Sequence, residues 1–451
     1  MTKLHMLGLV KDEHGGGTVM GLMWFMVIVG ICGLAVDSTD SLRTQTGLQS
    51  TADATALAAT MDLPNESLAL GKALLYSELN MPIAINGNVL TTGDVEFGTW
   101  DPLTRTFTPG GAVPLATRVE LHRSRTNGNA LASNFLRITG MDAWEDIAAA
   151  AVAERFIPEC LKDGLLAEGE VDMSSGNGFV NEICIYGKLG VDMQQANSFQ
   201  EGVTVMMPDP STQLTTPGGE LASNPGLAAA LRAGTQQLRM IGDLPNIIRK
   251  LKDPSLDVVY PPVIPSFINA MLPVIEERNN TIDFSTLDYT ENNGRIYYID
   301  CRGQPTVTVP PGTTLRNVAI VIECNLHFGA NVTLENVVLA SEKIGNGQDP
   351  LNHTNISFSA SAQIGKDDNC DEGGGVQIYS PASVQISSSA IIDGLQIVTG
   401  GDIQLGAQDF GINGISAQAG GDITMSSSNI FGLCSGGAPQ LFTVGYYHLV
   451  R

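Results

Sequence analysis

The chain contains 451 residues, of which 47 are acidic and 24 are basic, so its formal net charge is -23. This charge disfavours binding to nucleic acid or to an anionic membrane surface, because both attract basic proteins. Charged residues make up only 16% of the chain and glycine occurs 50 times, a composition typical of turn-rich β structure and unlike that of helical bundles or disordered tails. A chain of this length is expected to fold as two or three packed units.

The N-terminal segment contains an uncharged run of 22 residues, 15–36. Because an α-helix rises 1.5 Å per residue, about 20 apolar residues cross a hydrocarbon core of roughly 30 Å. The run therefore predicts a transmembrane helix. A cleaved signal peptide is an alternative, since Lys3 and Lys11 precede the run and Gly33 and Ala35 are small residues suited to cleavage, but the apolar region of a signal peptide usually has about 7 to 15 residues. A buried core helix is disfavoured because, past its first few residues, the run is apolar or glycine on every face.

The charges that flank the run predict its orientation. Lys3 and Lys11 precede it, whereas the other flank has only Arg43 behind two aspartates. Under the positive-inside tendency, residues 1–14 form a cytoplasmic tail and the chain beyond residues 15–36 is exported. We therefore expect a single-pass membrane protein whose bulk lies outside the cytoplasm.

Helical periodicity continues past the apolar run. Leu48, Ala52, Ala56 and Ala59 recur at helical spacing, and Pro64 marks a stop. The pattern predicts one helix of about 40 residues, half of it in lipid.

A shorter helix is predicted next, over residues 67–80, whose leucines would pack back on the first. The period then changes from 3.6 to 2 in residues 89–100, 104–109 and 116–124, which predicts strands joined by Gly and Pro turns. Residues 37–155 are therefore expected to form a small α+β domain.

Particular motifs relate this N-terminal region to a known family. A glycine-preceded apolar helix leads to an AVD junction and then to the pattern LQ-x-x-AD-A-x-ALAA. The residues that carry the junction and the pattern are Ala35, Val36, Asp37, Leu48, Gln49, Ala52, Asp53, Ala54, Ala56, Leu57, Ala58 and Ala59. With these motifs the segment resembles the N-terminal segment of TadG-like Flp pilus-assembly proteins, and residues 95–154 look like the rest of that region. The resemblance implies a single-pass inner-membrane protein of the tight-adherence pilus apparatus.

The sequence departs from this family in two places. Pilin-like members carry a glutamate a few residues after the glycine cleaved by a prepilin peptidase, but the fifth residue after Gly17 is Leu22. Pilin-type processing and assembly into the filament shaft are therefore not expected. Some larger relatives contain a von Willebrand A-type domain whose metal site begins D-x-[ST]-x-S. Residues 37–41 fit that string, but they follow a membrane helix and not a buried strand, so no metal is assigned.

The second half contains a repeat of 20 residues. Residues 171–173 recur at 191–193, Asn177 and Phe179 recur as Asn197 and Phe199, and residues 400–403 recur at 420–423. Short alternating segments such as VTVP, VQIY and VQISSS supply strands without helical period. Repeats of this length favour a parallel β-helix, in which inward Val, Ile and Leu side chains form a continuous core.

The predicted fold is therefore mainly β: a single transmembrane helix, a small α+β domain, and a right-handed parallel β-helix-like solenoid with a helical insertion. Residues 156–208 are expected to form disulfide-linked β-solenoid coils, and residues 301–451 further solenoid. Residues 209–300 form a helical and Pro-rich insertion, with helices in 224–240 and 244–253. Whether the two solenoid blocks make one continuous stack or two is left open by the sequence.

Cysteine usage agrees with an oxidising compartment. Cys32 lies in the apolar run, and the six cysteines beyond it are Cys160, Cys184, Cys301, Cys324, Cys370 and Cys434. Six cysteines allow 15 pairings, but two pairs are 24 and 23 residues apart, close to one coil. Cys160–Cys184 and Cys301–Cys324 could therefore bridge neighbouring coils, and Cys370 would pair with Cys434 by elimination. Some free buried thiols are an alternative, and zinc is disfavoured because C-x-x-C is absent and the histidines are scattered.

Candidate chemistry is sparse. In residues 366–375, Asp367, Asn369 and Asp371 alternate like calcium ligands, but the sixth position is Glu372 and not glycine, which favours a solvated acidic turn. The repeated Asp402 and Asp422 follow glycine pairs and are expected to stack one coil apart and to accept hydrogen bonds from backbone N–H groups.

No motif of a serine hydrolase, zinc protease or nucleotide-binding loop occurs in the sequence. We therefore expect no catalytic residue, no cofactor and no enzymatic activity.

Two functions remain from the sequence. The first is a structural or accessory component of Flp pilus assembly and adhesion, anchored in the inner membrane, with pilus-assembly proteins, cell wall or glycan as possible partners. The second is a membrane-held β-helix enzyme of the polysaccharide lyase or hydrolase class, since such enzymes use paired carboxylates or acidic cation sites.

Overall fold

The computed structural model describes residues 16–133, 135, 144–156, 158–161, 164–256, 264–278, 283–284, 294–303, 305–343, 354–368, 373–406, 411–432 and 445–450. The chain divides into two compact units. The N-terminal unit comprises Met1–Phe156 together with Gly445–Arg451, and the parallel-sheet unit comprises Ile157–Val444. The fold is mainly β with one long N-terminal helix, as predicted.

Helix α1, Gly16–Thr60, is a single helix of 45 residues, which confirms the continuous helix expected from the sequence. Its first half is long and apolar enough to span a membrane, and its side chains there are almost entirely exposed. Its second half packs into the N-terminal unit, where Leu48, Ala52, Ala56 and Ala59 are fully buried. Small side chains on this face let the helix lie close to the sheet behind it.

Two further helices complete this layer. Helix α2, Glu66–Asn80, begins where the Asn65 side chain accepts a hydrogen bond from the Leu68 backbone N–H, at 3.2 Å. It buries Ala69, Ala73 and Ser77. Helix α3, Ile83–Asn86, follows.

An antiparallel sheet in the order β2-β1-β3-β6-β31 forms the other layer. Its strands are β1 (Val95–Asp101), β2 (Thr106–Pro109), β3 (Ala116–Arg123), β6 (Ile147–Phe156) and β31 (Tyr446–Val450). A two-strand pair, β4 (Leu131–Ala132) with β5 (Trp144–Glu145), lies between β3 and β6 in the chain.

Strand β31 corrects the predicted extent of the C-terminal block. The sequence assigned residues 301–451 to one solenoid block, but β31 pairs antiparallel with β6, from Tyr446 opposite Phe156 to Val450 opposite Val152. The local alternation of YYHLV fits either sheet, and only the pairing partner distinguishes them. In the chain, the parallel-sheet unit is therefore an insertion between β6 and β31, which are neighbouring strands of the N-terminal unit's sheet.

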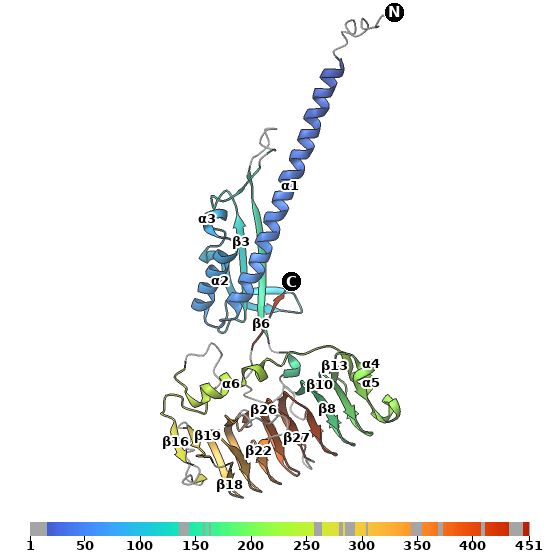
Figure 1. The fold of residues 1–451 in the computed structure, drawn as a ribbon, viewed down its shortest axis with the longest axis vertical. Coiled ribbons are helices and arrows are strands. Elements are labelled where there is room, and N and C mark those ends of the chain that lie inside the picture. The colour runs from blue at the N-terminus through green and yellow to red at the C-terminus, as the bar shows by residue number, and fades with distance from the viewer. Residues whose placement is uncertain are drawn as a thin grey trace, which may run out of the picture. The chain divides into compact units, whose positions relative to one another are not determined.

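The parallel-sheet unit contains two long sheets (Figure 1). The larger sheet follows the order β15-β13-β10-β7-β28-β26-β23-β21-β19-β17-β16, and β24 pairs with β21 and β26. Its strands are β7 (Gly164–Ala167), β10 (Cys184–Gly187), β13 (Thr204–Met207), β15 (Leu231–Ala233), β16 (Ile275–Arg278), β17 (Arg295–Asp300), β19 (Thr314–Ile322), β21 (Thr333–Ser341), β23 (Gln363–Ile364), β24 (Val376–Ser380), β26 (Ile391–Thr399) and β28 (Ile412–Ala419), and the short strands β9 (Gly178–Phe179), β12 (Ser198–Phe199) and β30 (Ile430–Phe431) also belong to it.

The second sheet has nine strands in the order β14-β11-β8-β29-β27-β25-β22-β20-β18. These are β8 (Glu170–Met173), β11 (Gly190–Met193), β14 (Leu214–Thr215), β18 (Thr306–Val309), β20 (Asn325–Phe328), β22 (Thr354–Phe358), β25 (Ser383–Ile386), β27 (Ile403–Leu405) and β29 (Ile423–Met425). Every pairing recorded within the two sheets is parallel, and their inward Val, Ile, Leu, Met and Phe side chains form one buried cluster. This arrangement is compatible with the predicted β-helix.

The two repeat blocks join in the middle of both sheets. Strand β28 pairs with β7, with Ala417 opposite Leu165, and β29 pairs with β8, with Ile423 opposite Val171. The chain therefore enters near the centre, proceeds outward to β15, and returns from β16 through successive strands until it lies beside its own beginning. This pairing answers the question that the sequence left open: both blocks belong to one continuous pair of sheets.

Helix α6, Arg239–Lys252, lies on the outer face of the larger sheet. It buries Met240, Leu244, Ile247, Ile248 and Leu251 in a second cluster. The sheet residues of that cluster include Tyr298, Ala319, Val321, Val338, Ala340, Tyr379 and Val398. Because α6 covers this face, strands such as β19 are buried on both sides and contain continuous apolar runs.

The predicted helix over residues 224–240 is largely wrong. Within it Leu227–Ala230 form the short helix α5 and Arg239 and Met240 begin α6, but Leu231–Ala233 form strand β15 instead of helix. β15 pairs with β13, with Val205 opposite Leu231. An alanine-rich segment has high helix propensity, but hydrogen bonding to an open sheet edge overrides it.

Buried asparagines connect successive strand levels. Asn177 accepts a hydrogen bond from the Asn429 backbone N–H, and the Asn177 N–H donates in turn to the Asn197 side chain, both at 2.9 Å. The Asn197 N–H donates to the Asn224 side chain, also at 2.9 Å. All four side chains are at most 1% exposed. This asparagine ladder satisfies backbone groups at a corner that no strand pairing reaches.

A phenylalanine stack follows the same levels. The Phe179 ring lies between Phe431 and Phe199, at centroid distances of 5.2 and 5.1 Å. The 20-residue recurrence of Asn and Phe therefore reflects residues that touch from level to level, including across the joint between the two blocks.

The asparagine ladder gives a stability prediction. Asn177→Ala removes the acceptor for the buried Asn429 N–H and the donor to the Ser174 carbonyl, so we expect the free energy of unfolding to fall by about 1–3 kcal/mol. Thermal or denaturant unfolding of the full chain in detergent measures this change. Gln195→Ala, at an exposed position, is the matched control. Equal free energies of unfolding for the two variants would contradict a stabilising role of the asparagine ladder.

Candidate functional site

The exposed face of the nine-stranded sheet presents one polar side chain from each strand in register. The residues of this outer row, in strand order, are Thr308, His327, Ser357, Gln385, Gln404, Thr424, Asp172, Asp192 and Thr215. All of them except Thr215 alternate with buried neighbours on their strands, as in β25, where Val384 and Ile386 are buried and Gln385 is exposed. With neighbouring strands about 4.8 Å apart, the row is about 40 Å long.

The outer row has two chemically different parts. From Thr308 to Thr424 it contains neutral hydrogen-bonding groups, and His327 Nδ1 is 2.9 Å from the Ser357 hydroxyl. Such a row can donate and accept hydrogen bonds along an extended polar chain. Sequence reasoning missed it, although the inward-outward-inward triplets VQI, IQL and ITM contain the signal.

The other part of the row is acidic. Asp172 and Asp192 lie opposite each other on adjacent parallel strands. Burial raises the pKa of the Asp172 carboxyl, and the charges of Asp192, Glu170 and Asp422 raise it further. The arrangement places a partly buried carboxylate beside like charges and leaves it easier to protonate than an ordinary aspartate.

The repeated Asp402 and Asp422 stack as predicted. Asp402 accepts a hydrogen bond from the Asp422 backbone N–H at 2.9 Å, and Asp422 accepts one from the Glu170 N–H at 2.8 Å. The second bond crosses the joint between the two blocks. Both carboxylates therefore satisfy backbone donors at a corner, which is the structural role expected from the sequence.

The acidic turn predicted around residue 367 is described only in part. Asn369, Asp371 and Glu372 lie outside the described residues, so the predicted alternation is not tested. Asp368 forms an ion pair with Lys366 at 3.0 Å. In the described part of the chain, no group of three or more His, Cys, Asp or Glu side chains is arranged to hold a metal ion. Residues 37–41, which fit the start of a von Willebrand A-type metal site, lie within helix α1.

Two of the predicted disulfides are present. Cys160 bonds to Cys184 and Cys301 bonds to Cys324, with Cα atoms 4.9 and 6.0 Å apart. The first links the segment before β7 to β10, and the second links the turn after β17 to the one before β20. Cys370 and Cys434 lie outside the described residues, and Cys32 is free and exposed.

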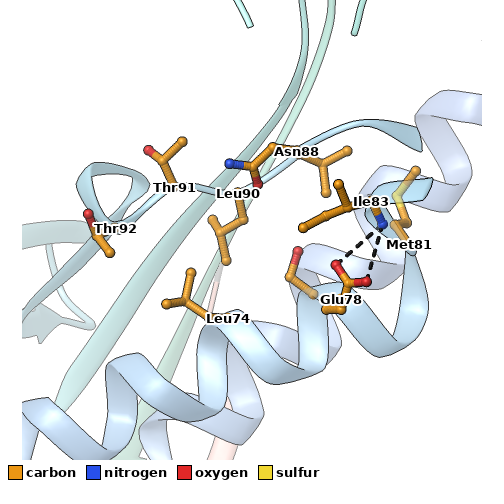
Figure 2. Close-up of a pocket in the computed structure, with 10 residues that line it drawn as sticks. Leu74, Glu78, Met81, Ile83, Asn88, Leu90, Thr91 and Thr92 are labelled. Atoms are coloured by element: carbon orange, nitrogen blue, oxygen red, sulfur yellow. Dashed lines mark hydrogen bonds between the residues drawn. The ribbon is translucent and has the colours of Figure 1, made fainter. Parts of the chain in front are cut away.

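The N-terminal unit contains a hollow of about 430 Å³ between α2 and the segment that leads to β1 (Figure 2). Its wall is mainly apolar and includes Leu74, Met81, Ile83 and Leu90. The Glu78 carboxylate accepts hydrogen bonds from the Ile83 backbone N–H at 3.3 and 3.4 Å. That carboxylate therefore stabilises the start of α3, and the hollow has the character of a packing surface more than of a reaction site.

Two family models match the chain. Residues 164–435 match the model of the domain of unknown function DUF7867. Residues 15–62 match the family model described as putative Flp pilus-assembly TadE/G-like. The second match confirms the resemblance inferred from the AVD junction and the LQ-x-x-AD-A-x-ALAA pattern. Among curated proteins and among solved structures, no match was found.

The Cys160–Cys184 disulfide closes a separation of 24 residues. In the chain-entropy description, replacing both cysteines by serine should lower the free energy of unfolding by about 3 kcal/mol. Denaturant unfolding under non-reducing conditions measures the effect, with Cys32→Ser as the control at a free thiol. Peptide mapping that finds Cys160 and Cys184 unlinked in native protein would contradict the assignment.

The acidic part of the outer row gives a pH-dependent prediction. Because the folded-state pKa of Asp172 is raised, its destabilising charge is absent below the unfolded-state pKa of about 3.9 and develops as pH rises through the folded-state value. Asp172→Asn should therefore raise the melting temperature by about 1–2 °C at pH 7 and have no effect near pH 3.

Melting curves across this pH range test the prediction, and Glu201→Gln, at an exposed site, is the control. A pH-independent effect of Asp172→Asn would show that packing, and not charge, is responsible.

Proposed function

The chain belongs to the DUF7867 family, and because its N-terminal segment is TadE/G-like, we propose that it is a non-enzymatic, membrane-anchored structural or accessory component of Flp/Tad pilus assembly and adhesion. In this proposal residues 1–14 are cytoplasmic, α1 crosses the inner membrane once, and the remaining chain is periplasmic or surface-exposed. Its partners are pilus-assembly proteins, cell wall or glycan.

The observation that carries the proposal is the continuity of α1 from an exposed apolar half into a buried core. The TadE/G-like match covers both halves, residues 15–62. No loop separates the exposed half from Leu48 and Ala52, which are fully buried in the N-terminal unit. A helix of this kind transmits the position of an anchor directly to the folded unit, as a structural component requires.

In this proposal the parallel-sheet unit carries the surface that binds the partner. We take its stacked strands as a right-handed β-helix-like solenoid whose outer row faces the partner. The neutral part of the row offers Gln385 and Gln404, both exposed and in register. Regularly spaced amide and hydroxyl groups suit an extended, hydroxyl-rich chain such as a glycan, because each level can form its own hydrogen bond.

A membrane-held carbohydrate-active enzyme is the second candidate, and one observation favours it. Asp172 and Asp192 are paired carboxylates on adjacent strands, and the pKa of Asp172 is raised. Retaining glycosidases use two carboxyl groups about 5–5.5 Å apart, one of them protonated. The two proposals therefore assign function to opposite parts of the same row.

A strain in which the coding sequence is deleted tests the first proposal. We expect loss of Flp pili by electron microscopy and loss of surface attachment, both restored by the full-length chain. A chain with Val27→Arg and Ile28→Arg should fail to restore them, because two charges in the exposed apolar half prevent stable insertion. Normal piliation and attachment in the deletion strain would overturn the proposal.

Variants of the outer row separate the two candidates in the complemented strain. Gln385→Ala with Gln404→Ala should reduce attachment and leave pilus number unchanged. Asp172→Asn with Asp192→Asn should leave attachment unchanged. If the purified wild-type chain cleaves polysaccharide and the Asp172→Asn, Asp192→Asn variant does not, the enzyme is the better description.

A further inference from the structure

A side chain of the sheet layer contacts α1 inside its apolar half. Between residues 17 and 39 of the helix, Gly33 and Asp37 are the two buried positions, and they lie one turn apart on the same face. Phe135, which follows β4, covers both of them. Its backbone N–H donates to the Asp37 carboxylate at 3.0 Å. A Cβ added to Gly33 would come within 2.6 Å of the Phe135 Cβ.

The position of this contact along α1 fixes its depth. Gly33 lies three residues before Val36, where the uncharged run ends. At 1.5 Å per residue, the contact is about 4.5 Å inside the end of the run. If the run spans the bilayer, the Phe135 ring lies at the level where acyl chains meet headgroups, the zone that holds aromatic side chains in membrane proteins.

Phe135 is also free to meet lipid. Its side chain is 39% exposed although its backbone is held by Asp37. The neighbouring helix side chains Leu34 and Val36 are 51% and 50% exposed. Together these three residues form an apolar surface around the helix end, with one member supplied from outside the helix.

We propose that Phe135 is a second membrane contact of this protein, inserted at the outer interface of the bilayer. It is held there by the Asp37 carboxylate and by the space that Gly33, which has no side chain, leaves on the helix surface (the Gly33 notch). The inference rests on the proposed membrane anchoring of α1 and adds a lipid-binding residue from the sheet layer. A single helix can rotate about its own axis, whereas a helix with a lateral contact at the interface fixes which face of the N-terminal unit meets the membrane.

Photo-crosslinking in the full-length chain tests this contact. The chain is purified and reconstituted in phosphatidylethanolamine and phosphatidylglycerol vesicles, with p-benzoylphenylalanine in place of Phe135, Leu22 or Leu103. Leu22 lies in the apolar half of α1 and Leu103, 93% exposed, lies in the turn between β1 and β2 of the same unit. After irradiation, intact-mass spectrometry detects phospholipid adducts.

We expect lipid adducts at positions 22 and 135 and none at 103. Adducts at 22 but not at 135 would overturn this inference and leave membrane anchoring intact. Absence of adducts at both 22 and 135, or an intact mass that shows cleavage after the apolar run, would overturn the anchoring itself. An equal yield at 103 would show non-specific labelling and remove the support for Phe135.

A matched pair of helix variants tests the notch. Gly33→Leu fills the space that Phe135 occupies and should lower the adduct yield at position 135 roughly twofold or more. Gly30→Leu, on the same helix with no atom within 4 Å of an added Cβ, should leave the yield unchanged. Equal yields in the two variants would contradict the role of Gly33.

Discussion

Hydrogen bonding of β28 to β7 and of β29 to β8 is the constraint on which the parallel-sheet unit depends. Without it, each repeat block would end in the middle of the unit with an open sheet edge and an exposed apolar core. The joint reproduces the contacts made elsewhere along the stack: Phe431 lies on Phe179, Asn177 accepts from the Asn429 N–H, and Asp422 accepts from the Glu170 N–H. Residues 252 positions apart thus interact as residues 20 positions apart do within the blocks.

This topology explains how the unit is attached. Because the chain enters and leaves at adjacent strand levels, both connections start from one region, and both lead to neighbouring strands, β6 and β31, of the other sheet. The first and last described strands of the unit, β7 and β30, therefore lie at the joint and not at the outer ends of the stack. The return segment that this arrangement requires is α6, whose apolar face covers the larger sheet and leaves the nine-stranded sheet as the polar face.

The same alternation that builds the core also sets the chemistry of the exposed face. Every strand of the nine-stranded sheet except β14 buries the two side chains that flank its member of the outer row, so strands in register produce a single row. Its members come from segments distant in the chain, and the neutral and acidic parts meet at the joint, where Thr424 is opposite Asp172. In the N-terminal unit, the contact of Phe135 with Gly33 and Asp37 gives the AVD junction a specific structural role.

Local patterns were sufficient for much of this protein. The uncharged run and the small residues from Leu48 to Ala59 determined α1, because helix formation and burial depend on neighbours three and four positions apart. The 20-residue recurrences and the 24- and 23-residue cysteine spacings predicted the parallel strands, the Asp402–Asp422 stack and two disulfides, because each repeat touches its neighbour at a fixed offset. The pairing of β28 with β7, the return of β31 to β6, the strand β15 in an alanine-rich segment and the outer row were decided only by tertiary structure. Each depends on which sheet edge is free to accept a strand, and an edge is a property of the folded chain that no local pattern encodes.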